Sequence, residues 1–163
     1  MLKKVRIRIS TERTGVAVDL FSDKPVAAGE ISAPERSEMT VEGRYHDDGT
    51  RVSIAYEETE ISGMEGTRAT LFYQKSDPGQ VTLARTGSVK TALVFEAGCR
   101  HECLYQTPIM PFEVCVQTAM VQNAIEAMGT MELDYISQIK GAEAERTRMR
   151  IVISPAYDKP QGL

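Results

Sequence analysis

Three side chains that can bind a metal ion alternate along one short stretch of the chain: Cys99, His101 and Cys103. A period of two is that of a β-strand, so we expect all three on one face of a strand. Residues two apart on a strand are about 6.6 Å apart and residues four apart about 13 Å, so one ion could take two of these ligands but hardly all three. The same separation excludes a Cys99–Cys103 disulfide, which needs Cα atoms within about 7 Å.

Burial in the core is the interpretation we favour for this stretch, because free cysteine is among the most buried residue types. His101 would then find a hydrogen bond, and we expect no metal and no cofactor. A fourth ligand would have to come from elsewhere, and the other histidine, His46, lies beside a predicted turn at residues 47–49.

A cysteine nucleophile with His101 as its base is the weaker alternative. It needs an oxyanion site, and no glycine-rich turn or helix start is found beside it. Cys115 lies between Glu113 and Gln117, so we expect an exposed thiol on an outer face. We assign no catalytic residue and lean against an enzyme.

The composition is that of one soluble globular domain spanning residues 1–163, with 42% hydrophobic and 26% charged residues. A net charge of −4 argues against nucleic-acid binding, which depends on clustered Lys and Arg. No stretch approaches the 18 apolar residues of a membrane span, so we expect no membrane partner. Three cysteines without framework spacing fit a reducing compartment, which predicts a cytoplasmic protein.

Alternation of apolar and polar residues dominates the sequence and indicates strands with one buried face. Val5, Ile7 and Ile9, for example, alternate with charged residues. About 8–10 short strands joined by tight turns, without βαβ spacing, predict an all-β fold with a single antiparallel barrel, whose closure would remove exposed sheet edges. Three segments differ from this pattern: 15–34 is expected as a long loop or insertion, 118–128 has room for a short helical turn, and 155–163 is expected as a loose tail.

The chain also resembles a known family through landmarks whose order and spacing agree, covering about residues 37–153. These landmarks are Gly43-x-Tyr45, Tyr56-Glu57-Glu58, Arg85-x-Gly87-x-Val89, Phe95-x-x-Gly98, Tyr105-x-Thr107-Pro108, and Gly129 with Leu133-x-Tyr135. They resemble the YwiB-like proteins, small bacterial calycin-like barrels of unknown function. The resemblance implies a lipocalin-like barrel with an internal cavity and brings no established activity; the 15–34 segment is longer than that family's pattern.

Arg85 follows Val81 and Leu83 on the face expected to point inward. A buried guanidinium must be paired, because an isolated buried charge is very costly. In calycin-like barrels an arginine commonly closes one end against a tryptophan, which this chain lacks, so a tyrosine would have to serve. We favour this closing role over binding of a ligand carboxylate or phosphate. Glu57, Glu58 and Glu60 are expected at a solvated strand end.

An eight-stranded barrel is just wide enough to be filled by side chains or to hold one small ligand. Our leading hypothesis is non-catalytic binding of a small, partly apolar and anionic ligand inside the barrel. The residues expected to face it are Arg85, Tyr56, Tyr105, Tyr135 and His101. The alternative is a solid barrel that acts as an interaction or assembly module through its outer surface or the 15–34 segment, with a homodimer left open.

Overall fold

The computed structural model describes residues 2–22, 29–59 and 66–156. Their strands are β1 (Leu2–Ala17), β2 (Gly29–Glu30), β3 (Glu35–Asp47), β4 (Arg51–Glu57), β5 (Thr67–Gln74), β6 (Asp77–Gly87), β7 (Thr91–Glu96), β8 (Arg100–Gln106), β9 (Pro111–Ala124), β10 (Thr130–Ile139) and β11 (Ala144–Pro155), with one short helix, α1 (Ile125–Met128). Residues 23–28, Glu60 and the tail 157–163, for which loops were expected, lie outside this range.

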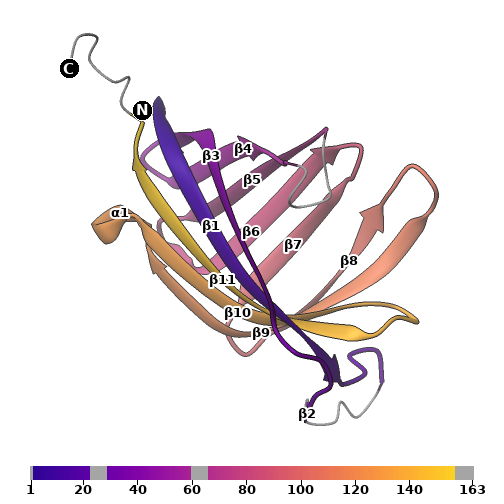
Figure 1. Ribbon diagram of the computed structural model, residues 1–163. Coiled ribbons are helices and arrows are strands. Elements are labelled where there is room, and N and C mark those ends of the chain that lie inside the picture. The colour runs from indigo at the N-terminus through magenta and orange to yellow at the C-terminus, as the bar shows by residue number, and fades with distance from the viewer. Residues whose placement is uncertain (1, 23–28, 60–65, 157–163) are drawn as a thin grey trace.

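The strands form one antiparallel sheet in the order β7-β6-β5-β4-β3-β1-β11-β10-β9-β8, with β2 beside β1. The sheet curves round so that its first and last strands approach each other (Figure 1). Between β7 and β8, the described residues are joined by the Lys90–Gln106 bridge and by the turn in which the Cys99 amide donates to the Glu96 carbonyl. The predicted all-β antiparallel barrel is therefore confirmed, in a nearly closed form.

Alternation along the strands fills the barrel with apolar side chains, as expected. On β1, Val5, Ile7 and Ile9 point inward, and the whole core forms one cluster that reaches Phe95 on β7 and Leu133 on β10. The polar residues between them point to the outer face, which is why charged residues line the outside of β1 and β11.

The first strand is longer than its alternation suggested. β1 continues from Ser10 to Ala17, because β11 pairs with it from Val5 as far as Val16. The loop expected for 15–34 is therefore wrong at its beginning, and β2 pairs with the end of β1.

The segment after β1 covers part of the outer face of the sheet. The Leu20 amide donates to Gln138 Oε1 at 2.7 Å, and the Leu20 carbonyl accepts from Arg100 Nη1 at 2.9 Å. Cys115 lies on β9 opposite Gln138 and Glu102 on the two neighbouring strands, and its side chain is fully buried. The prediction of an exposed Cys115 thiol is therefore wrong, because sequence alternation could not show that Leu20 returns over this face.

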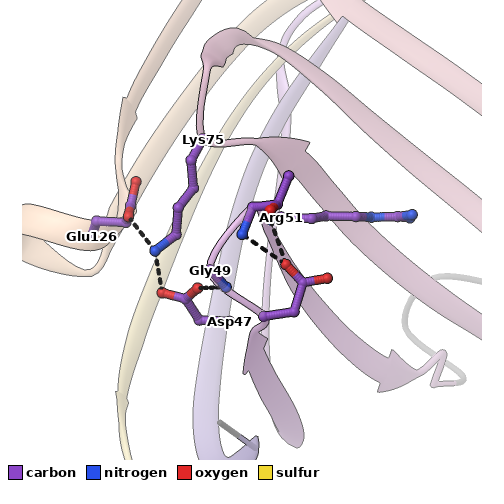
Figure 2. Close-up of polar contacts among 7 residues, drawn as sticks. Asp47, Gly49, Arg51, Lys75 and Glu126 are labelled. Atoms are coloured by element: carbon purple, nitrogen blue, oxygen red, sulfur yellow. Dashed lines mark hydrogen bonds and ion pairs between the residues drawn. The ribbon is translucent and has the colours of Figure 1, made fainter.

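α1 follows directly on β9, so the helical turn allowed for 118–128 is found only at its last residues. Ile125 is buried, whereas Glu126 faces the β3–β4 turn. Figure 2 shows the Lys75 ammonium between two carboxylates, 2.6 Å from Asp47 and 3.4 Å from Glu126. The side-chain hydrogen bond that Lys75 donates to Asp47 raises the pKa of Lys75, which keeps the ammonium charged. Lys75 thus links the β3–β4 turn to α1.

Candidate ligand-binding site

Arg85 is buried and paired, as the sequence analysis required. Its Nε donates to Glu58 Oε1 at 3.1 Å, and the two side chains are only 10% and 2% exposed. Burial alone would lower the pKa of Arg85, but the Glu58 carboxylate outweighs it and raises that pKa. The expected solvated position of Glu58 is wrong, whereas Glu57 is exposed and pairs with Arg68.

Tyr56 and Tyr135 are buried in the same interior as Arg85. Burial raises the pKa of both phenols, and Arg85 acts on both in the opposite direction, so the three side chains lie near one another. The Tyr135 ring lies 4.5 Å from that of Phe95, centroid to centroid. Glu58 could not be predicted as the partner of Arg85 from the sequence. It lies just after the end of β4, outside the alternation of apolar and polar residues.

The barrel interior leaves little free space beside this cluster. The void found there has a volume of about 10 Å³, close to the minimum for one water. It is enclosed by Ile7, Ile9, Ile54, Tyr56, Leu71, Leu83, Met149 and Ile151. At this level, the part of the barrel that the structure describes is filled by side chains.

The other two residues expected to face a ligand, His101 and Tyr105, lie on β8. Both are half-buried on the inward face of the strand, with Cys103 between them. His101 Nε2 is buried and has no hydrogen-bond partner among the described residues. β8 is the last strand of the sheet, so these side chains lie at the seam with β7.

Two of the three cysteines have a thiol pKa raised above its ordinary value. Cys99 Sγ donates to Glu96 Oε1 at 3.2 Å, and this hydrogen bond raises the pKa of the Cys99 thiol. Burial raises the pKa of Cys115. Cys103 Sγ lies 3.6 Å from Thr91 Oγ1. Among residues 2–22, 29–59 and 66–156, no three His, Cys, Asp or Glu side chains are grouped to hold a metal ion.

A groove of about 580 Å³ lies on the opposite, outer face of the sheet, within the 300–1,000 Å³ typical of small-molecule sites. Its lining comes from five strands and consists of Ser10, Thr11, Glu12, Arg36, Ser37, Glu38, Met120, Glu132, Leu133, Asp134, Arg148, Met149 and Arg150. Most of these side chains belong to the outward-pointing set. The side chains of Arg148 and Arg150 are 55% and 59% exposed.

Met120 reaches the groove because β9 carries a β-bulge. Asp134 pairs with Met120 while its neighbour Tyr135 pairs with Thr118, so Ala119 has no partner in the ladder. The extra residue places Met120 outward beside Asp134, whereas Thr118 stays inside. The bulge thus supplies the groove with a half-buried apolar side chain among charged ones.

The charged lining is largely paired across the strands. Asp134 accepts two hydrogen bonds from Arg146, at 3.0 and 2.7 Å. Hydrogen bonding to Asp134 is the main reason why the pKa of Arg146 is raised. Glu12 accepts from Arg36 at 3.3 Å. These contacts join charged side chains of neighbouring strands on this face of the sheet.

With an antiparallel barrel and a site of this geometry established, comparison with known proteins defines the family. Residues 27–151 match the family described as a domain of unknown function, DUF1934, and the chain belongs to this family. The structure is similar to the crystal structure of the ywiB protein from Bacillus subtilis, with a TM-score of 0.72 and 16% sequence identity over 96% of this chain and 94% of that chain. At this identity the likeness shows the fold alone. No curated protein matches the chain, and the described residues contain no helix long and apolar enough to cross a membrane.

Proposed function

We propose that this protein is a non-catalytic binding protein for a small, partly apolar ligand, and that the ligand sits in the outer groove. One observation carries the proposal: the groove offers about 580 Å³, whereas the void among the core residues measures about 10 Å³. The cytoplasmic location expected from the three cysteines is part of the same proposal.

The lining of the groove suits such a ligand. Ligand sites combine apolar surface with a few polar groups, and the groove lining combines Met120 with charged and hydroxyl side chains. The raised pKa of Cys99 and Cys115 also supports binding without catalysis, because a thiol attacks only as its thiolate. A ligand inside the barrel, touching Arg85, Tyr56, Tyr105, Tyr135 and His101, is the competing proposal.

Replacing Met120 with tryptophan should block the groove and abolish binding of a neutral apolar probe. The larger side chain would occupy the space beside Asp134 from an outward position, so the core would stay unchanged. We expect N-phenylnaphthylamine to show saturable binding to the wild-type chain and at least about tenfold weaker binding to M120W, measured by probe fluorescence.

The matched control is Met128→Trp, because Met128 is 72% exposed on α1 and lies outside the groove lining. This control should bind the probe like the wild-type chain. Equal binding by wild type, M120W and M128W would show that the groove is not the site.

Protein interaction is a second candidate, favoured by exposed apolar side chains at the β8–β9 hairpin. Leu104, Ile109 and Met110 are 54%, 90% and 53% exposed there. A homodimer formed through this hairpin is the simplest such assembly. Ile109→Asp should then convert a dimer to a monomer in light scattering, and a monomeric wild-type chain at high concentration would contradict it.

A further inference from the structure

We infer that the ligand of the outer groove is an organic anion, and that Arg148 binds its negatively charged group. This inference rests on the proposed function, because it assigns the charge of the molecule that the groove binds. The observation behind it is that Arg148 lies between two carboxylates that are each hydrogen-bonded to another arginine.

Strand register places Arg148 at the centre of a charged row. It lies directly opposite Glu12 on β1 and directly opposite Asp134 on β10. Either carboxylate could pair with it across the strands. Neither does so closely, because Glu12 is bonded to Arg36 and Asp134 turns diagonally to Arg146.

Arg148 is therefore left with a loose contact. Its one ion pair among the described residues joins Nε to Asp134 Oδ2 at 3.8 Å, which is too long for a hydrogen bond. The backbone of Arg148 is held in β11, and its side chain is 55% exposed. Its donors are thus available to a ligand oxyanion, which a guanidinium can hold through two parallel hydrogen bonds.

Arginines in and beside the groove offset the carboxylates of its lining. Each of the four carboxylates that line the groove has an arginine partner: Glu12 with Arg36, Glu38 with Arg8, Glu132 with Arg150, and Asp134 with Arg146. With Arg8 and Arg146, which lie outside the lining, five arginines meet these four carboxylates, and Arg148 is the one that shares its carboxylate, Asp134, with another arginine.

A second side chain that can bind an anion and one apolar side chain lie close to Arg148. Arg150 points outward two positions along β11, about 6.6 Å away, and its own pair with Glu132 is also loose at 3.8 Å. Met120 lies beside Asp134, the cross-strand neighbour of Arg148. An oxyanion between the two arginines would therefore place the rest of its molecule against Met120, which fits a partly apolar organic acid.

Two probes that share one scaffold test this inference. N-phenylnaphthylamine is neutral, and anilinonaphthalene sulfonate is the same ring system with an added sulfonate. We expect the wild-type chain to bind the sulfonate more tightly than the neutral probe, by a margin that shrinks as salt screens the charge. Arg148→Gln should weaken sulfonate binding about tenfold and leave neutral-probe binding unchanged within about twofold.

The matched control is Arg6→Gln, which removes the same charge from an outward position on β1 that lies outside the groove lining. It should leave both affinities unchanged. If Arg148→Gln weakens the binding of both probes equally, or changes neither affinity, then Arg148 does not bind the anion. The M120W variant tests the groove independently of this result. If M120W blocks neither probe, the proposed function itself fails.

Discussion

Replacing Arg85 with leucine should lower the free energy of unfolding by about 3–5 kcal/mol, because it leaves the Glu58 carboxylate buried without a partner. The Glu58 side chain is 2% exposed and Arg85 Nε is its ion-pair partner at 3.1 Å. Unpairing a charge at such a position costs far more than losing the same contact at the surface. Urea unfolding followed by circular dichroism would measure the loss.

Two further variants separate the buried charge from loss of packing. The double variant Arg85→Leu with Glu58→Leu removes both charges and should regain most of the lost stability. Arg68→Leu breaks the exposed pair with Glu57 and should cost less than about 1 kcal/mol. An unfolding midpoint of Arg85→Leu equal to that of the wild-type chain would contradict the closing role of Arg85.

Replacing Gly43 with alanine should produce the second large loss of stability, about 1–3 kcal/mol or more. An added Cβ would lie 2.5 Å from the Ala55 carbonyl oxygen and 2.5 Å from Ile7 Cδ1. The Ile7 side chain can rotate, but Ala55 is held in the β3–β4 ladder opposite Arg44. The two strands would therefore have to move apart, and β3 needs glycine where it lies so close to β4.

Gly79→Ala is the matched control for this prediction, since the nearest atom to its added Cβ is Asp77 Oδ1 at 3.9 Å. We expect it to unfold at nearly the wild-type urea concentration. Equal midpoints for G43A and G79A would show that β3 and β4 have room to relax.

The barrel could be predicted from the sequence because period-two alternation is a direct consequence of one buried and one wet face. The extent of β1 could not, because alternation of apolar residues stops after Ile9 while pairing with β11 continues to Val16. Glu58 was misplaced for a related reason. Its burial depends on Arg85, which is 27 residues away in sequence and two strands away in the sheet.

The candidate site was harder to predict than the fold. Alternation places the arginines of β11 on the outer face, but it does not show that side chains from five strands line a groove there. The direction of Met120 depends on the bulge at Ala119, which shifts the face of every later residue on β9 by one position. Neither the groove nor the bulge has a sequence signature here.

The methyl groups of methionine give the most direct test of where the ligand binds, since the chain has 8 methionines and those on the described strands lie on both faces of the sheet. Met120 lines the outer groove, Met131 is fully buried in the core and Met128 is exposed on α1. In a titration of methyl-labelled protein with N-phenylnaphthylamine, we expect a large NMR shift for Met120 and almost none for Met131 and Met128. A large shift of the Met131 signal without a shift of the Met120 signal would place the ligand inside the barrel. That result would contradict binding in the outer groove.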